Sequence, residues 1–83
     1  MYVVVTYDAD SEERENIRTI VKKQLHWVQH SVYAGELTRS ATEDLFRKLK
    51  SSVREARVSF WVFDRPPDIR QIGTQKDRES IFL

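Results

Sequence analysis

The sequence contains no cysteine, only two glycines and only two prolines, and its hydrophobic runs are short. Without cysteine, the chain can form neither a disulfide bond nor a thiolate zinc site, and it suits a reducing compartment. Apolar runs such as Val3-Val4-Val5 are too short to cross a membrane. Met1 leads directly into a strand-like segment with no basic region and no small-residue cleavage site, so we expect no secretory signal. These absences predict a soluble cytoplasmic protein that does not contact a membrane.

The scarcity of glycine excludes one class of binding site. With glycine only at Gly35 and Gly73, the chain has no glycine-rich loop that could surround a phosphate group. It also has no recognisable nucleophile motif of a hydrolase. Metal chemistry that uses carboxylates is the catalytic possibility that remains.

The composition nevertheless predicts a folded domain. The 83 residues are 40% hydrophobic and 11% aromatic, which is too rich for a disordered segment and suits one small domain. A domain of this size buries only about 60% of its unfolded surface, so we expect a partner chain to add stability. The net charge of +1 hides a separation, since five acids and one base precede Ile17, whereas eight bases and three acids lie from Ile17 to Arg54. This asymmetry predicts a basic face beside an acidic pocket.

Several segments have the composition and period of β-strands. Met1 to Tyr7 is β-branched and aromatic, which predicts a strand covered on both faces in the middle of a sheet. Residues 57–64 predict a second strand whose middle is apolar on both faces and therefore covered. Trp27 to Leu37 is either one long bent strand or two short strands folded near His30-Ser31, and the pattern does not decide between them. After Pro66-Pro67, residues 69–72 predict a short edge strand.

Two segments have the apolar spacing of amphipathic helices. In the first, the apolar stripe continues to Leu25, and a row of bases lies on another face. The second is expected to end near Arg54. The predicted caps are Asp10 with Glu13, or Ser11 alone, for the first helix, and Ser40 with Glu43 for the second.

The order of these elements favours an α+β domain in which two helices pack on one face of an antiparallel sheet, the ferredoxin-like arrangement. The other face of the sheet is then bare, and we expect Trp27, Tyr33 and Trp61 to lie there. A small chain with a bare aromatic sheet face is expected to bury it against a second copy of itself.

Asp8 is the main candidate for chemistry, because it directly follows the buried first strand at the exposed rim of the sheet. A carboxylate held there suits a hard cation such as Mg²⁺. One carboxylate is a poor magnesium site alone, but in a two-fold dimer the two Asp8 side chains could hold one ion together. The alternative is that Asp8 only caps the following helix or its turn.

Other candidates have ordinary structural alternatives. His26 and His30 lie in strand-like sequence, where they would be about 13 Å apart, too far to share one metal ion. Tyr7 and Tyr33 are either packing residues or residues that stack on a nucleic acid. A helical row of bases either contacts a phosphate backbone or is merely solvated. This row consists of Arg14, Arg18 and Lys22.

Two segments resemble the CRISPR-associated protein two family, the small subunits of the spacer-acquisition machinery. These are the opening Met-Tyr-Val-Val-Val-Thr-Tyr-Asp and the later Trp-Val-Gln-His-Ser-Val-Tyr-Ala-Gly-Glu-Leu. The resemblance runs from Met1 to about Phe63. It implies a ferredoxin-like βαββαβ fold with a hairpin that turns near His30-Ser31, and an additional C-terminal strand.

The resemblance also implies a homodimer that packs through its sheet faces. In that arrangement the whole chain is a single domain, and residues 74–83 form a loose segment followed by a C-terminal strand that is exchanged across the dimer. The apolar end Ser80–Leu83 independently favours such pairing, since it would be poorly placed in water.

Family members described as nucleases use the aspartate that ends the first strand, here Asp8, in a magnesium-dependent phosphodiesterase site at the dimer interface. RNA and double-stranded DNA are the substrate classes. Tyr7 and Arg14 match positions that accompany this aspartate, and Ser31 and Tyr33 match positions that line the same cleft. The expected function is therefore a nucleic-acid-binding subunit of the CRISPR adaptation complex that cleaves phosphodiester bonds and docks the integrase subunit.

The same resemblance leaves alternatives open. In other family members the dimer is a non-catalytic DNA-binding bridge between integrase dimers, and the fold also occurs in stand-alone, toxin-like ribonucleases. Two features depart from the family pattern. The chain continues with Arg65-Pro66-Pro67, and the acids Glu12, Glu13 and Glu15 near the expected cleft would repel a phosphate backbone.

Overall fold

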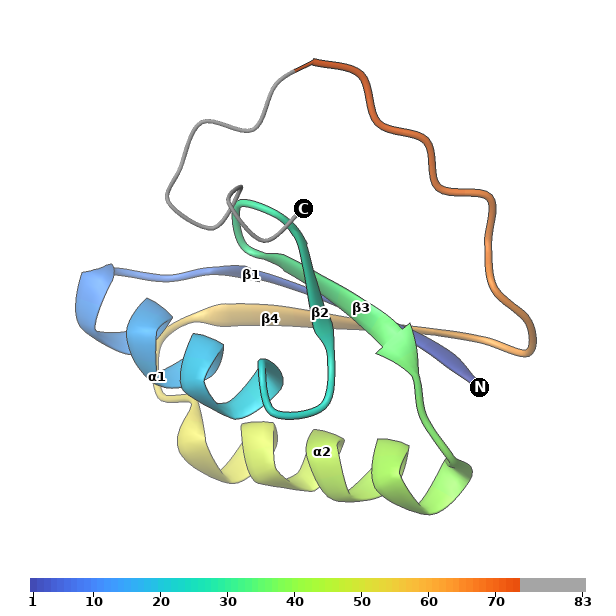
Figure 1. Ribbon diagram of the computed structural model, residues 1–83. Helices are drawn as coiled ribbons and strands as arrows, with labels where there is room; N and C mark the ends of the chain where they lie inside the picture. The colour runs from blue at the N-terminus through green and yellow to red at the C-terminus, as the bar shows by residue number, and fades with distance from the viewer. Residues whose placement is uncertain (74–83) are drawn as a thin grey trace.

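The computed structural model describes residues 1–73. The predicted C-terminal strand and the loose segment before it, residues 74–83, lie outside the described residues. The elements follow one another as strand, helix, two strands, helix and strand (Figure 1). Their bounds are β1 (Tyr2–Asp8), α1 (Ser11–Val21), β2 (His26–Gln29), β3 (Val32–Glu36), α2 (Arg39–Ser52) and β4 (Arg57–Phe63).

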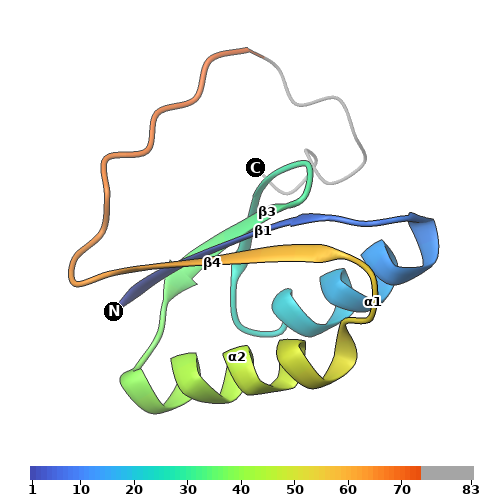
Figure 2. The ribbon, with the colours of Figure 1, turned by 180° about the vertical axis from the view of Figure 1, so that it is seen from behind.

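The four strands form one antiparallel sheet in the order β2-β3-β1-β4. Strand β1 lies inside the sheet and pairs with β3 on one side and β4 on the other, as its composition predicted. It is not covered on both faces as also predicted, because no element of residues 1–73 forms a second layer over its open face. Both helices lie on the same face of the sheet (Figures 1 and 2). The predicted ferredoxin-like α+β fold is confirmed.

The core lies between the helices and one face of the sheet. Strand β1 alternates, with Val3, Val5 and Tyr7 buried and the residues between them only partly covered. This period of two is that of a strand with one face against a core. The helices and the chain that follows α1 complete the core with Ile17, Val21, Leu25, Leu45 and Leu49.

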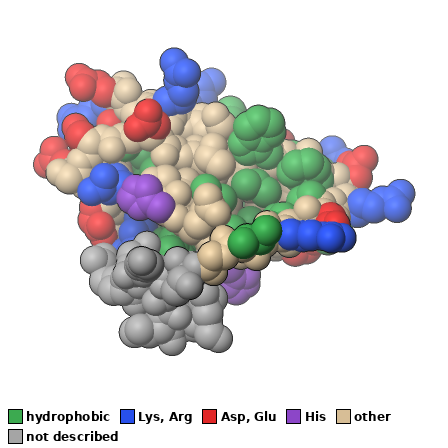
Figure 3. All heavy atoms as spheres, turned by 90° about the horizontal axis from the view of Figure 1, so that it is seen from above, with side chains coloured by type: hydrophobic (Ala, Val, Ile, Leu, Met, Phe, Trp, Pro, Cys, Tyr) green, Lys and Arg blue, Asp and Glu red, His purple; other side chains and the backbone are tan. Residues whose placement is uncertain are grey.

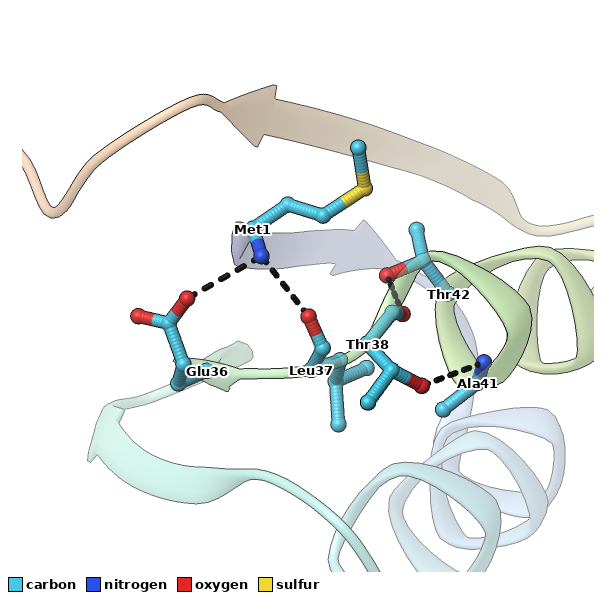
Figure 4. A network of polar contacts seen from close by, with 6 residues as sticks. All are labelled: Met1, Glu36, Leu37, Thr38, Ala41 and Thr42. Atoms are coloured by element: carbon cyan, nitrogen blue, oxygen red, sulfur yellow. Dashed lines mark hydrogen bonds and ion pairs between the residues drawn. The ribbon is translucent and has the colours of Figure 1, made fainter.

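Helix α2 begins earlier than predicted. Thr38 is its N-cap, and the Thr38 hydroxyl accepts the Ala41 backbone N–H at 3.1 Å, so the expected capping box of Ser40 and Glu43 is wrong. The connection before the helix also holds the start of β1 (Figure 4). The amino terminus of Met1 donates to the Leu37 carbonyl at 2.8 Å and pairs with the Glu36 carboxylate at 3.0 Å.

Two other predicted boundaries differ from the structure. Helix α1 ends at Val21, and Leu25 reaches the core from the turn that follows the helix, not from the helix itself. Residues 69–72 form no strand. This segment meets the sheet through a side chain, because the Gln71 amide donates to the Val28 carbonyl at 2.9 Å. Residues 27–37 are two strands, and the positive φ of 61° at Ser31 turns the chain between them.

The aromatic residues expected on the bare face divide between the two faces. Tyr33 is buried in the core and Trp27 packs against it, so that expectation is wrong for both. Their positions follow from the register, which pairs Trp27 with Tyr33 and Tyr33 with buried Val5. Trp61 does lie on the open face, and it is 53% exposed. The middle of β4 is not covered on both faces as predicted, because both helices pack on the other face of the sheet and leave Trp61 and its neighbours on the open face exposed.

The buried ridge of α2 predicts a clear difference between neighbouring positions. Leu45 is 2% exposed, whereas Lys48 on the same helix is exposed. Leu45→Ala should lower the free energy of unfolding by about 2–5 kcal/mol, since it leaves a cavity between α2 and the sheet. Lys48→Ala should change it by less than about 0.5 kcal/mol. Urea denaturation measures both, and equal midpoints for the two variants would contradict the described core.

Candidate functional site

Asp8 is the last residue of β1, and its side chain is exposed. Tyr7 before it points into the core, so Asp8 projects from the opposite, open face of the sheet. Its partner in the register of β1 and β4 is Arg57. The candidate catalytic carboxylate therefore stands at the end of the open face, held by a strand that is paired on both sides.

The helix cap is a different aspartate. Asp10 is the N-cap of α1, and its carboxylate accepts the Glu13 backbone N–H at 2.9 Å. The alternative that Asp8 caps this helix is therefore wrong. Among residues 1–73, no hydrogen bond or ion pair involves the Asp8 side chain.

Glu13 makes a contact that a capping box does not explain. Its carboxylate accepts three backbone N–H groups from the connection between α2 and β4. The donors are Arg54, Glu55 at 3.2 Å and Ala56 at 2.9 Å. The pKa of Glu13 is lowered below its ordinary value of 4.5, most strongly by the Arg54 N–H; desolvation opposes this, and the Glu55 and Ala56 N–H groups lower the pKa further. The first turn of α1 is thus joined to the start of β4.

The acids that were expected to repel a phosphate backbone are partly used in this way. Glu13 binds the loop before β4, Asp10 caps α1, and Glu15 pairs with the Arg18 guanidinium at 3.1 Å. Because local donors face two of the three acids expected to repel a phosphate, Glu13 and Glu15, their repulsion is weaker than the sequence suggested, whereas exposed Glu12 has no such donor among residues 1–73.

The predicted basic row is only partly a continuous surface. Arg14 and Arg18 lie on α1 and are partly covered, whereas Lys22 is the C-cap residue just beyond the helix and is exposed. Arg18 also pairs with Glu15, which reduces its availability to a ligand. The row therefore presents Lys22 most openly.

Tyr7 and Tyr33 face the core. Tyr7 is 8% exposed and Tyr33 2%, and their rings stack with centroids 6.5 Å apart. Their burial supports the packing alternative over base stacking, because neither ring presents a face to solvent. Ser31 stays close to the candidate site through its backbone, since its carbonyl accepts the Tyr7 N–H at 3.1 Å.

The described residues offer no ready-made metal centre. Residues 1–73 contain no group of three or more His, Cys, Asp or Glu side chains that could hold an ion. His26 and His30 are both exposed, one at the start of β2 and the other in the turn after it. Within the described residues, Asp8 is the carboxylate that β1 brings to this end of the open face.

The open face changes in character along its length. Next to Asp8 and Arg57, the register places Thr6 opposite Ser59, and farther along it places Val4 opposite Trp61. A groove of about 420 Å³ lies on this face between the sheet and the segment that follows β4. Figure 3, which looks onto this face, shows hydrophobic side chains gathered in its middle and charged ones nearer its margins.

Sequence reasoning missed Arg57 as a residue of this region and missed the loop contact of Glu13. Arg57 had no motif to mark it, because its position opposite Asp8 follows only from the register of β1 and β4. Glu13 was considered only as half of a cap and as a source of repulsion. Its bonds to residues 54–56 could not be predicted, because they join segments more than 40 positions apart in the sequence.

The fold and the position of Asp8 place the chain among small ferredoxin-like domains, and comparisons with known proteins define the family. The family model for CRISPR associated protein Cas2 matches residues 1–66. The chain therefore belongs to the Cas2 family. Neither helix in residues 1–73 is long and apolar enough to span a membrane.

Similar proteins agree with this assignment. A protein of Thermotoga maritima named CRISPR-associated endoribonuclease Cas2 is 31% identical, and the match covers 100% of both chains. A protein of the same name from Fusobacterium nucleatum is 33% identical over 100% of this chain and 87% of its own. One from Methanosarcina acetivorans is 40% identical, but over only 66% of this chain and 59% of its own.

Solved structures support the fold. A crystal structure of a Cas2 protein, 32% identical, has a TM-score of 0.82 and covers 92% of this chain and 90% of its own. The crystal structure of Streptococcus pyogenes Cas2 at pH 6.5, with 22% identity and a TM-score of 0.67, covers 76% of this chain and 86% of its own and shares the fold.

The bonds of Glu13 predict how stability depends on pH. A carboxylate with a lowered pKa stabilises the fold above about pH 4.5, and this contribution is lost as the pH falls through the lowered pKa of the folded state. Glu13→Gln should therefore lower the melting temperature at neutral pH, and its difference from the unsubstituted chain should shrink as the solution is acidified. Thermal unfolding followed by circular dichroism measures this.

The neighbouring Glu12→Gln is the matched control, since Glu12 is exposed. It removes the same charge one position away without touching the loop before β4. If both variants had the same melting temperature at every pH, the loop contact of Glu13 would not stabilise the folded state.

Proposed function

We propose that this protein is a homodimeric subunit of the CRISPR adaptation complex that binds nucleic acid and hydrolyses phosphodiester bonds at the Asp8 end of its sheet. Relatives that match the whole chain are named as endoribonucleases, which supports the reaction class. The observation that carries the proposal is the position of Asp8. Its carboxylate is exposed at the end of a doubly paired strand, and another residue caps the helix.

The open face supports the homodimer. Its apolar part includes Trp61, which is 53% exposed, and Phe63, which is 37% exposed. Aromatic side chains on an open sheet face are costly in water and are typical anchors of protein interfaces. A second copy related by two-fold symmetry would cover the same residues on both chains. In that dimer the apolar part of the face forms the contact, and the polar end carrying Asp8 lies at its margin.

The dimer also answers the shortage of metal ligands. One chain brings one carboxylate to the site, whereas two-fold symmetry brings two, and Mg²⁺ prefers one or two carboxylates together with water and phosphate oxygens. A bound Mg²⁺ would stabilise the charge that develops on the phosphate and activate a water molecule. The role of Asp8 is to hold that ion in a fixed position. No residue of the chain is assigned as general base, so hydroxide or bulk water serves.

Nucleic acid would be bound by basic side chains near this end of the fold. Arg14 lies in the first half of α1, closest to Asp8, and Arg18 follows it beside Glu15. Lys22 lies just beyond the far end of the helix and extends the basic row away from Asp8. Contacts of this kind neutralise phosphates without reading sequence. The surface of the dimer that carries these basic side chains would also dock the integrase subunit of the complex.

A non-catalytic bridge between integrase dimers is the second candidate function. The observation that favours it is the lack of a three-ligand metal cluster among residues 1–73. In this alternative the dimer and the basic surface are kept, and Asp8 is not a metal ligand.

Asp8→Asn distinguishes the two functions. It keeps the size of the side chain but removes the ligand charge, so cleavage of RNA or duplex DNA with Mg²⁺ should fall by about 100-fold or more. Rates are measured with purified dimer, with magnesium and with chelator. The control is Asp10→Asn, which removes the same charge two positions away and retains a good N-cap.

The control protein should keep most of its activity. If Asp8→Asn cleaved as fast as the unsubstituted chain, the catalytic role of Asp8 would be wrong, and the cleavage would come from another site or a contaminant. Binding of nucleic acid without cleavage, by the unsubstituted chain and by Asp8→Asn alike, would favour the bridge.

The proposed dimer predicts a second difference. Trp61→Ala should raise the dissociation constant of the dimer by about tenfold or more, since it removes an aromatic anchor worth at least about 1.4 kcal/mol. Phe46→Ala is the control, because Phe46 is also exposed, at 46%, but lies on α2. Sedimentation equilibrium measures both. A dimer weakened only by Phe46→Ala would place the interface on the helical face.

A further inference from the structure

Arg57 stands beside Asp8 on the open face. The two residues are partners in the register of β1 and β4. Val58 and Phe60 pack against the core, so Arg57 projects from the opposite face of β4, as Asp8 does from β1. Paired side chains on one face of an antiparallel sheet have their Cβ atoms about 4.5–5.5 Å apart. A ligand held by one of them is therefore within reach of the other.

The Arg57 guanidinium is not occupied by a local acid. Among residues 1–73, neither Arg57 nor Asp8 forms an ion pair, although the two face the same side of the sheet. Three other arginines differ in this respect, whereas four more, Arg14, Arg39, Arg54 and Arg65, likewise form no ion pair within residues 1–73. Arg18 pairs with Glu15, Arg47 with Asp44, and Arg70 with Asp68.

The chain just before Arg57 is held in place. Glu13 accepts the backbone N–H groups of the three preceding residues, 54–56, which ties this connection to the first turn of α1. On the other side of Arg57, β4 is paired with β1 along its whole length. The backbone that carries Arg57 is therefore held on both sides, which fixes the point from which its exposed side chain leaves the sheet.

We propose that Arg57 binds a phosphate group of the nucleic acid at the Asp8 site. The proposal rests on the proposed function for the location of that site and adds a residue that no motif marks. Arginine suits the task because its planar fork of N–H donors matches two phosphate oxygens and stays charged. Thr6 and Ser59, the next pair along the same face, bring hydroxyl groups that also donate to phosphates.

The salt dependence of binding tests this inference without cleavage. Asp8→Asn dimer in the presence of chelator is titrated with a short fluorescein-labelled DNA duplex, and separately with a single-stranded RNA, over a series of salt concentrations. Loss of one phosphate contact should lower the slope of log K against log salt by about 0.9 for the duplex or about 0.7 for the single strand. Arg57→Gln should show this loss together with weaker binding at low salt. The ligand that shows it identifies the class of nucleic acid.

Arg39→Gln is the matched control, because Arg39 is exposed and lies at the end of the sheet away from Asp8. Arg39 begins α2 shortly after β3, and Glu36 at the end of β3 pairs with Tyr2 at the start of β1. Arg39→Gln makes the same charge change and should leave the slope as it was. Arg57→Lys should retain the slope but bind more weakly, since a point charge replaces the fork. Sedimentation of each variant checks that the dimer is intact.

Three results would overturn the inference: an Arg57→Gln slope equal to that of the unsubstituted chain, a loss of slope shared with Arg39→Gln, or dissociation of the dimer by Arg57→Gln. The last would make Arg57 a subunit contact. The catalytic proposal fails separately, through cleavage that survives Asp8→Asn, and in that case the slopes still decide the role of Arg57.

Discussion

Strand β1 is paired on both of its edges, and its alternation determines the side of the sheet to which each of its residues belongs. Val3, Val5 and Tyr7 occupy the core, so Asp8 must project from the open face. A slip of one residue in either pairing would bury Asp8 and expose two fully buried valines. Each valine contributes roughly 1.5–3 kcal/mol through burial, which makes such a slip costly in a small domain. The position of the candidate catalytic carboxylate is therefore a consequence of core packing.

The Glu13 carboxylate is the second constraint on this region. It joins α1 to the loop before β4 through three hydrogen bonds from backbone N–H groups. These bonds depend on the path of the chain and not on the residue types in the loop. The same bonds reduce the field that this acid would otherwise exert on a phosphate. An acid that looked unfavourable for nucleic-acid binding thus helps to hold the candidate site in shape.

The two ends of the open face suit different tasks. Val4 and Trp61 offer an apolar surface for a second chain. At the other end, the Asp8 carboxylate could bind a cation and the Arg57 guanidinium a phosphate. The described part of one chain has no cluster of three or more His, Cys, Asp or Glu side chains that could hold a metal ion. Under the proposed function, association and chemistry are therefore linked, because the contact that covers the apolar end is also what doubles the carboxylates at the polar end.

The sequence by itself determined the two helices, the first and fourth strands, the central position of β1 and the exposed strand-end position of Asp8, because each depends on local period or on strand-end position. It wrongly predicted a strand at residues 69–72. Only the tertiary structure decided the division of Trp27, Tyr33 and Trp61 between the two faces, since a hairpin register is a pairing between segments and is not written in either one. The same holds for Arg57 opposite Asp8 and for Glu13 on residues 54–56, where the partners are distant in the chain and meet only once the sheet has formed.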